Sequence, residues 1–290
     1  MTMLPRLVDY YELSKPRIIA LLLVTTAAAM IMAARGLPSF GLLFWTLLAG
    51  ALAAASAGAL NCVWDADIDR IMKRTQSRPI PQGRVSIRNA TIYALLAGSA
   101  SFAIFYLLVN PLAAWLSLVG NVYYVAIYTM WLKRITPLNI VVGGAAGSVP
   151  PLVGWAAVTH TVGAPALGLF ALIFLWTPPH FWSLALMTET DYGKAKVPMF
   201  PNVYGTERTK REIVYYSIVL VAASLVLYPL HVMGALYFGA AAVLGGIFVL
   251  DAFRTWREQT GTLRARVLFR YSLLYLALMC AVMVIDRIVT

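Results

Sequence analysis

Residues 61–79 read Asn61-Cys-Val-Trp-Asp65-Ala-Asp67-Ile-Asp69-Arg70-Ile-Met-Lys73-Arg74-Thr75-Gln-Ser-Arg78-Pro79 and follow the second long apolar run of the chain. If the helix of that run continues, Asn61, Asp65 and Asp69 stand four residues apart and share one face. Asp67 then falls on the other side. Two carboxylates one turn apart repel each other unless a positive charge lies between them. The spacing therefore predicts a divalent cation on Asp65 and Asp69, with Asn61 on the same polar stripe.

The bases that follow this stripe suit a phosphorylated ligand. A carboxylate pair that leaves metal coordination positions open for phosphate oxygens is typical of Mg²⁺ sites that bind diphosphates. Lysine and arginine bind such oxygens directly. We therefore expect Mg²⁺ and a diphosphate here, with phosphate contacts from the bases Lys73, Arg74, Arg78 and Arg84. The alternative is an ordinary solvated helix end, but ionisable groups at the mouth of a membrane span usually have a function.

The composition is that of an integral membrane protein. Of the 290 residues, 61% are hydrophobic and 12% are charged, and apolar runs long enough to cross a bilayer recur along the chain. We predict an all-α, polytopic protein with nine transmembrane helices in a single domain over residues 1–290. The expected spans are 17–35, 40–64, 88–109, 111–131, 138–159, 164–187, 211–229, 232–251 and 267–286.

The positions of the 23 lysines and arginines account for the net charge of +11 without any nucleic acid. With a cytoplasmic N-terminus, all of them except Arg35 and Arg287 lie on the cytoplasmic side or at its edge, as the positive-inside rule requires. The C-terminus is then external. The first 16 residues resemble neither a secretory signal nor a transit peptide, so we expect a bacterial-type plasma (inner) membrane.

Two spans carry paired prolines, which predict kinked or broken helices. The fifth span contains Pro150-Pro151, together with Gly143 and Gly147 in the G-x-x-x-G spacing of a helix-packing face. The sixth span contains Pro178-Pro179. Broken helices at membrane depth are tolerated where the freed backbone lines a cavity or is otherwise satisfied.

His180 directly follows the second proline pair and allows two interpretations. Its imidazole either hydrogen-bonds carbonyls that the prolines deprive of donors, or faces a flat aromatic or metalloporphyrin ligand among aromatic neighbours such as Trp176. The residues alone leave both open. His160 and His231 lie at the external ends of their spans, where we expect a structural or solvated role.

Several strings, in order along the chain, resemble the UbiA superfamily of intramembrane prenyltransferases. The spacing Asn61-x-x-x-Asp65-x-x-x-Asp69 is similar to the first aspartate motif of that superfamily. Many members carry a second aspartate pair after the sixth span, whereas here Met187 stands four residues before Asp191. The haem-farnesylating branch of the superfamily is similar in this respect. Further strings of this chain also resemble that branch: Ser14-Lys-Pro-Arg17, residues 67–75 with Arg78-Pro79, residues 139–144, residues 150–155, residues 176–182 and Asp191-Tyr192.

The resemblance implies a UbiA-type bundle with a cytoplasm-facing active-site cavity. It also implies transfer of the farnesyl group of farnesyl diphosphate to the vinyl group of protohaem IX, with water addition, giving haem O and diphosphate. The implied Mg²⁺ ligands are Asp65 and Asp69, with a further contact from Asp191, alone or with Glu189. Diphosphate contacts are expected from Arg74, Arg78, Lys133, Arg134 and Lys196, haem binding from His180, and shielding of an allylic cation from Trp64, Tyr124, Tyr128 and Trp176.

Two other functions stay open. One is the same fold acting on an aromatic quinone precursor, against which the haem-type strings argue. The other is a membrane transporter, which would place its ionisable groups near the bilayer midplane, whereas here they gather in cytoplasmic loops. The expected partners are the lipid bilayer and a later haem-modifying enzyme or terminal oxidase assembly.

Overall fold

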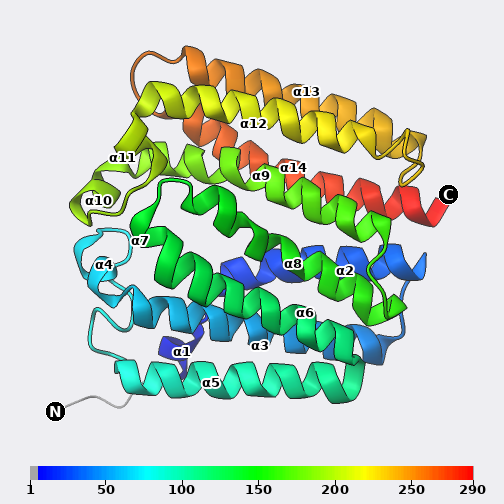
Figure 1. Cartoon of the computed structure of the whole chain (residues 1–290), viewed down its shortest axis with the longest axis horizontal. Coiled ribbons are helices and arrows are strands. Elements are labelled where there is room, and N and C mark those ends of the chain that lie inside the picture. The colour runs from blue at the N-terminus through cyan, green and yellow to red at the C-terminus, as the bar shows by residue number, and fades with distance from the viewer. Residues whose placement is uncertain (1–5, 290) are drawn as a thin grey trace.

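Residues 6–289 are described by a computed structural model, and within them the chain is all-helical (Figure 1). Long helices run side by side between two ends of a bundle, and short helices gather at one end. The long helices are α2 (Pro16–Ala34), α3 (Phe40–Trp64), α5 (Ile87–Ile104), α6 (Pro111–Val122), α8 (Asn139–Thr159), α9 (Ala164–Met187), α12 (Thr206–Val226), α13 (Ala235–Arg257) and α14 (Leu263–Val289). The short helices are α1 (Leu7–Leu13), α4 (Ala66–Ile71), α7 (Lys133–Ile135), α10 (Glu189–Lys194) and α11 (Phe200–Tyr204). Two π-helical segments, η1 (Phe105–Val109) and η2 (Tyr123–Leu132), extend α5 and α6.

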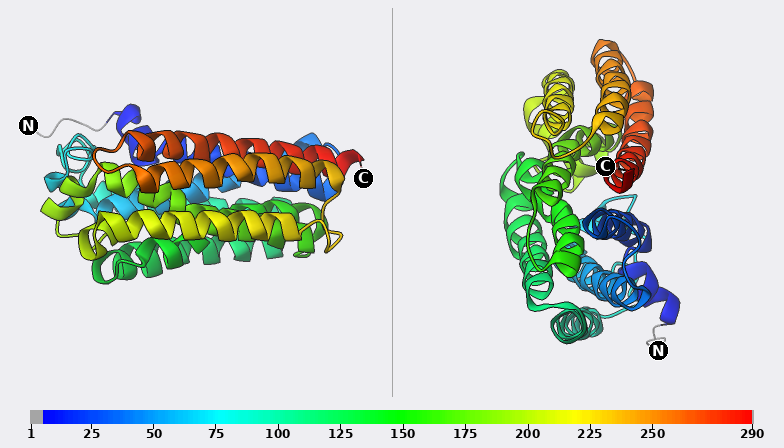
Figure 2. Two further views of the ribbon diagram at one scale, coloured as in Figure 1. Left: turned by 90° about the horizontal axis from the view of Figure 1, so that it is seen from above. Right: turned by 90° about the vertical axis from the view of Figure 1, so that its right-hand side faces the viewer.

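Eight helical segments in the described part are long and apolar enough to cross a membrane, and they match eight of the nine expected spans. The ninth expected span, 211–229, corresponds to α12, which has 21 residues but carries five charged residues among its first seven. Its apolar part is therefore shorter than that of the others. α12 still packs along α9 and α13, and α1 and the end of α14 lie at opposite ends of the bundle (Figures 1 and 2). That placement requires an odd number of passages along the bundle.

The helices form two sides joined through α8 and α9. α12, α13 and α14 make one side, and α2, α3 and α5 make the other (Figure 2). In the most apolar stretch of each spanning helix, 56% of the residues are buried in α8 and 67% in α9. The share in the other six is 22–39%, so α8 and α9 are the central helices. The outer helices expose large apolar side chains, which suits contact with lipid tails.

Both proline pairs lie inside continuous helices, so a break at either pair is absent. α8 is helical through Pro150-Pro151 and α9 through Pro178-Pro179. Proline costs a helix about 3 kcal/mol by removing a hydrogen bond and crowding the preceding turn. Because α8 and α9 are the most buried helices, packing on several sides maintains the helical path that proline disfavours.

Small residues set the distances between α8 and its neighbours, but the expected G-x-x-x-G face is only half right. A Cβ added at Gly143 would overlap the ring of Tyr128, whereas nothing lies within 4 Å of one added at Gly147. The closest backbone approach is at Gly154, where an added Cβ would overlap the carbonyl oxygen of Thr26 on α2. Gly154 therefore allows α2 and α8 to pack backbone to backbone.

We predict that Gly154→Ala destabilises the bundle and that Gly147→Ala does not. The first change forces α2 and α8 apart, and overpacking of this kind costs about 1–3 kcal/mol. The second adds a methyl group in open space to a helix, where alanine is favoured over glycine by up to about 1 kcal/mol. Thermal unfolding of both purified variants checks this. Equal melting temperatures for the two variants would contradict the assigned α2–α8 contact.

Candidate active site

The acidic stretch forms a bend rather than one straight helix. α3 ends at Trp64, Asp65 is its C-cap, and α4 begins at Ala66, so the expected uninterrupted helix is wrong. The one-turn spacing survives the bend because the backbone N–H of Asp65 donates to the Asn61 carbonyl (2.9 Å) and that of Asp69 to the Asp65 carbonyl (2.8 Å). Asp65 and Asp69 are 1% and 2% exposed, whereas the side chain of Asp67 is 62% exposed. Asp65 and Asp69 are thus buried together while Asp67 faces outward, which agrees with the expected separation of Asp67 from the other two acids.

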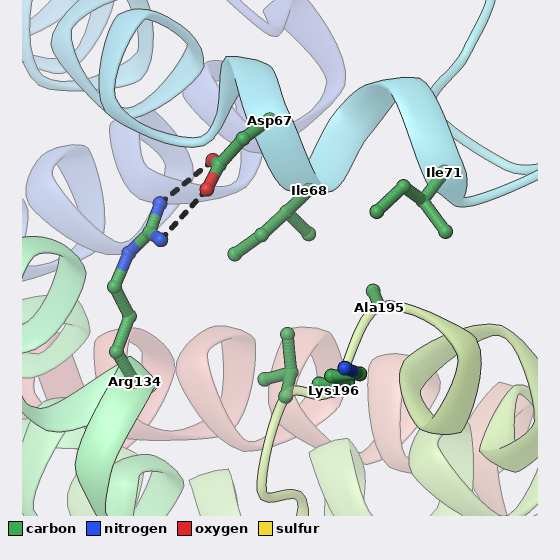
Figure 3. A pocket seen from close by; sticks show the side chains of 7 residues that line it. Asp67, Ile68, Ile71, Arg134, Ala195 and Lys196 are labelled. Atoms are coloured by element: carbon green, nitrogen blue, oxygen red, sulfur yellow. Dashed lines mark hydrogen bonds and ion pairs between the residues drawn. The ribbon is translucent and has the colours of Figure 1, made fainter.

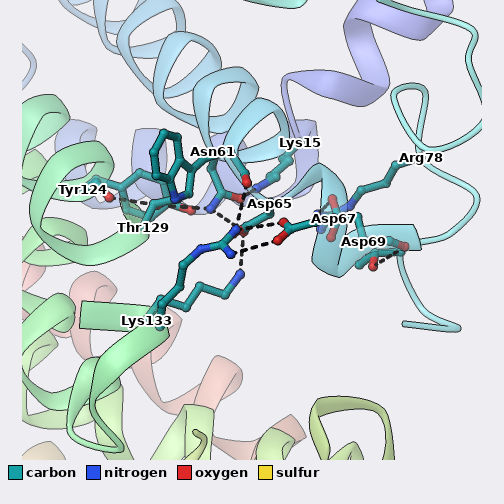
Figure 4. Close-up of polar contacts among 12 residues, drawn as sticks. Lys15, Asn61, Asp65, Asp67, Asp69, Arg78, Tyr124, Thr129 and Lys133 are labelled. Carbon is teal, nitrogen blue, oxygen red and sulfur yellow. Dashed lines mark hydrogen bonds and ion pairs between the residues drawn. The ribbon is translucent and has the colours of Figure 1, made fainter. Parts of the chain in front are cut away.

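The carboxylate of Asp65 is at the centre of the polar cluster in Figure 4. Its Oδ2 accepts hydrogen bonds from Asn61 Nδ2 (2.8 Å) and Lys133 Nζ (2.5 Å). Its Oδ1 is buried without a hydrogen-bond partner, and Arg134 Nη2 is 4.0 Å away. A buried carboxylate oxygen without a partner is costly unless a donor or cation joins it. This oxygen therefore fits a hard divalent cation.

The other two acids pair with arginines from different segments. Arg78 Nη1 donates to Asp69 Oδ2 at 2.7 Å. Arg134 binds Asp67 through two parallel hydrogen bonds of 2.8 and 2.9 Å. These hydrogen bonds from the guanidinium lower the pKa of Asp67 to about 2, so the pair stays charged at any pH near neutrality. Both arginines, expected as diphosphate contacts, thus lie at the acidic stripe.

A π-helical segment supplies the facing wall. In η2, Thr129 Oγ1 donates to the carbonyl of Tyr124, five residues earlier, and accepts a hydrogen bond from Asn61 Nδ2 (3.1 Å). Lys133 follows directly after η2 and reaches Asp65. The wider π-helical turn therefore sets which residues face the acids, and π-helical turns often occur at functional sites. The rings of Tyr124 and Tyr128 pack together in the same segment, 5.4 Å apart.

A hollow of about 250 Å³ opens beside the outlier acid, between α4 and residues 195–197 (Figure 3). Asp67, Arg134 and Lys196 all line it, so the structure brings Lys196 to the same site as Arg134. Apolar packing holds the two walls together, because α4 and the 197–199 segment share one buried cluster that includes Ile68, Met72, Val197 and Met199.

Arg74 and Asp191 are less integrated into the site. Arg74 is exposed, and Asp191 is partly exposed. Within residues 6–289, no group of three or more His, Cys, Asp or Glu side chains is placed to hold one metal ion. Asp191 therefore does not complete a three-carboxylate set with Asp65 and Asp69, and its role in metal binding stays a prediction.

His180 of α9 is buried against α14, among aromatic neighbours as expected, and its hydrogen-bond partner is a serine hydroxyl rather than a carbonyl; its role in haem binding stays a prediction. Its ring lies between those of Trp176 (4.2 Å between centroids) and Phe269 (4.7 Å), and its Nδ1 is 2.6 Å from Ser272 Oγ. Ser272 Oγ also lies 2.7 Å from the Phe269 carbonyl, to which its hydroxyl can donate. Nδ1 of His180 is therefore engaged by Ser272, and Nε2 is the ring nitrogen left for another partner.

The aromatic residues expected around an allylic cation lie in two places. Tyr124 and Tyr128 belong to η2 beside the acids, and Trp64 lies under the guanidinium of Arg134, 6.0 Å from the ring centroid. Trp176 instead hydrogen-bonds the Ser272 carbonyl through Nε1 at 2.8 Å. Its assignment to the same group as the tyrosines therefore stays a prediction.

The profile of the UbiA prenyltransferase family matches residues 22–274. The chain belongs to that family. A protoheme IX farnesyltransferase from Synechocystis sp. is 53% identical over 281 residues, which cover 97% of this chain and 89% of the relative. A protein of the same name from Trichodesmium erythraeum is 51% identical over 281 residues, covering 97% and 86%.

Solved structures of UbiA homologues share the fold. A structure described as digeranylgeranylglyceryl phosphate synthase superposes with a TM-score of 0.81 over 98% of this chain and 99% of that chain, at 17% identity. A UbiA homologue from Archaeoglobus fulgidus bound to GPP and Mg²⁺ gives a TM-score of 0.70 over 95% and 99%, at 18% identity. At such identities the likeness concerns the fold alone. It places this chain in the helical architecture of the UbiA family.

Two polar contacts of the site were not expected from the sequence, although Lys15 belongs to the string Ser14-Lys-Pro-Arg17 that carries the resemblance. Lys15 Nζ donates to Asn61 Oδ1, and Thr129 accepts from the same amide. Burial lowers the pKa of Lys15, while the charges of Asp65 and Asp69 act in the opposite direction. The available signals were a base directly before the helix start at Pro16 and one threonine in an apolar run. Neither signal indicates that Lys15 contacts Asn61, 46 residues later, or that Thr129 contacts Asn61, 68 residues earlier.

We predict that Ser272→Ala lowers the stability of the α9–α14 contact more than Ser217→Ala does. Removing the Ser272 hydroxyl leaves the buried Nδ1 of His180 without its hydrogen-bond partner, at a cost of about 1–3 kcal/mol. Ser217 is equally buried but bonds only the Ile213 carbonyl of its own helix, so its loss is mild. Thermal unfolding measures both. A Ser217→Ala variant that melts at or below the Ser272→Ala variant would contradict the assigned hydrogen bond.

Proposed function

We propose that this chain transfers the farnesyl group of farnesyl diphosphate to the vinyl group of protohaem IX (haem B), with addition of water, and so makes haem O and diphosphate. Its relatives with 51–53% identity over nearly the whole chain are named for this reaction. The observation that carries the chemistry is the buried carboxylate of Asp65, with one oxygen unpartnered and bases on either side of it. Such a site suits a cation and a diphosphate together.

The chain's own residues would act mainly on the leaving group. Asp65 and Asp69 would hold Mg²⁺, which when bound supplies positive charge to the departing diphosphate. Arg78 and Lys133 would exchange their carboxylate partners for phosphate oxygens, and Arg134 and Lys196 would bind from the hollow beside them. Because these donors are largely preorganised and partly shielded from water, they stabilise charge as it develops on the diphosphate.

Departure of the diphosphate breaks the C1–O bond and leaves an allylic cation on the farnesyl chain. The terminal vinyl carbon of the porphyrin then bonds to C1, and water captures the resulting cation next to the macrocycle, with loss of a proton. Tyr124 and Tyr128, which lie beside Asn61 and Thr129, would present their rings to the allylic cation. The bundle would lie in a bacterial inner membrane with this end in the cytoplasm, as the distribution of bases indicates.

The direct test is incubation of the purified protein in lipid nanodiscs with labelled farnesyl diphosphate and either protohaem or 4-hydroxybenzoate. We expect label only in the haem fraction, as a hydroxyethylfarnesyl haem by mass spectrometry, and no transfer in excess EDTA. Label in 4-hydroxybenzoate alone would replace the proposal with a quinone-precursor acceptor. Transfer undiminished by EDTA would refute the metal-assisted route.

We predict that Asp65→Asn and Asp69→Asn each lower the transfer rate by at least about 100-fold, whereas Asp67→Asn lowers it by less than about tenfold. The first two remove negative charge from the buried pair. The third only weakens an exposed ion pair with Arg134. Initial rates with saturating protohaem measure the effects, and melting temperatures show that each variant is folded. Equal losses from all three would remove the distinction between the buried pair and the outlier.

We predict that His180→Ala changes the Soret band of the protohaem complex and weakens haem binding, with farnesyl diphosphate affinity nearly unchanged. The reason is that a neutral imidazole nitrogen suits an iron ligand, and Nδ1 of His180 is engaged by Ser272, which leaves Nε2 for the iron. His160→Ala is the control because His160 is exposed at the far end of α8. Parallel loss of affinity for both substrates in His180→Ala would instead show that the imidazole only stabilises the α9–α14 contact.

A further inference from the structure

We propose that Lys15 is a further ligand of the donor's diphosphate, a role that rests on the proposed function. Lys15 lies at the start of α2, outside the acidic stretch and the basic segments that follow it. Its ammonium nevertheless reaches Asn61, the first residue of the polar stripe (Figure 4). Three features of the structure indicate that the ammonium of Lys15 is positioned to bind an anionic ligand.

The first feature is the backbone of Lys15 itself. Its φ of 57° and ψ of 60° lie in the left-handed region, which is strained for a residue other than glycine. This conformation turns the chain between α1 and α2. Strain of this kind persists only where the surrounding structure maintains it, and it concentrates at functional sites.

The second feature is the packing that maintains this turn. A Cβ added at Gly58 would lie 3.3 Å from the Ser14 carbonyl oxygen, so the α1–α2 turn rests directly on α3, one turn before Asn61. Leu13, fully buried, shares one apolar cluster with Ala59 and Cys62 of α3. On the other side, Ser14 Oγ hydrogen-bonds Tyr93 of α5 at 2.6 Å. These contacts fix the origin of the Lys15 side chain beside the acids.

The third feature is the partner of the ammonium. Arg78 and Lys133 each pair with a carboxylate, whereas Lys15 bonds the neutral amide oxygen of Asn61. Within the described residues, no carboxylate oxygen lies within 4.0 Å of Lys15 Nζ. Lys15 is therefore the base at the stripe whose charge is not yet matched by a direct contact.

The charges at the stripe favour an anionic ligand. Two buried acids, Asp65 and Asp69, stand among three bases, Lys15, Arg78 and Lys133, while Asp67 and Arg134 pair with each other. A bound cation would add further positive charge. A prenyl diphosphate is therefore a ligand whose negative charge this site can compensate, and Lys15 would supply part of that compensation.

Binding of farnesyl S-thiolodiphosphate, whose C–S bond is not cleaved, tests this in the presence of Mg²⁺. We expect Lys15→Gln to weaken binding about 10- to 100-fold, as for loss of a charge-assisted hydrogen bond. Lys15→Arg keeps the charge and should stay within about fivefold of the original chain. Arg17→Gln removes the same charge from an exposed position two residues later and should have less than a twofold effect.

Comparison with farnesyl monophosphate separates ligand from support. If Lys15 binds phosphate, Lys15→Gln loses more affinity for the diphosphate than for the monophosphate, because the diphosphate carries more charge. Equal losses for both, or a folded Lys15→Gln variant within twofold for the diphosphate, would overturn the proposal. If the original chain itself fails to bind, the proposed function fails instead.

A second measurement needs no variant, in case Lys15→Gln does not fold. The rate at which an amine reagent acetylates Lys15 of the original chain is followed by peptide mass spectrometry. Inorganic diphosphate with Mg²⁺ should slow this rate at least about fivefold, and Mg²⁺ alone should not. An unchanged rate with diphosphate would overturn the proposal.

Discussion

The burial of two carboxylates one helical turn apart is the constraint on which the rest of this structure depends. Asp65 and Asp69 are nearly inaccessible to solvent, and charges in such a place are unstable without partners. The chain meets this requirement with Arg78 after α4 and Lys133 after η2, which pair with the two acids, and Lys15 before α2 bonds Asn61 on the same stripe. Each of these segments must therefore converge on the bend between α3 and α4.

That convergence explains several features of the bundle. The π-helical turn of η2 brings Thr129 and Lys133 to the stripe, and the left-handed turn at Lys15 does the same for its ammonium. Gly58 allows the α1–α2 turn to approach α3, and Gly154 allows α2 to approach α8. Local costs in backbone strain and helix geometry are offset by one shared polar cluster.

The same cluster explains why the site suits a reaction with an anionic leaving group. Its bases already donate to oxygen atoms of Asn61, Asp65 and Asp69, so they need little rearrangement when phosphate oxygens take the place of those acceptors. In water, by contrast, solvent dipoles must reorient around the developing charge, which costs much of the stabilisation of the leaving diphosphate. His180 belongs to a separate arrangement, an aromatic stack between α9 and α14. If it binds protohaem as proposed, haem binding and the packing of the central helix α9 depend on the same side chain.

The sequence by itself determined the membrane-embedded helical class, eight spans within a few residues, and the separation of Asp67 from Asp65 and Asp69, because hydropathy and one-turn spacing are local properties of the chain. The haem-type strings likewise led to the family that the comparisons show. Tertiary structure alone decided that both proline pairs stay helical, that Gly147 faces open space, and that Lys15 and Thr129 join the site. These outcomes depend on contacts between segments far apart in the chain, where packing energy outweighs local preference and leaves no periodic signal to read.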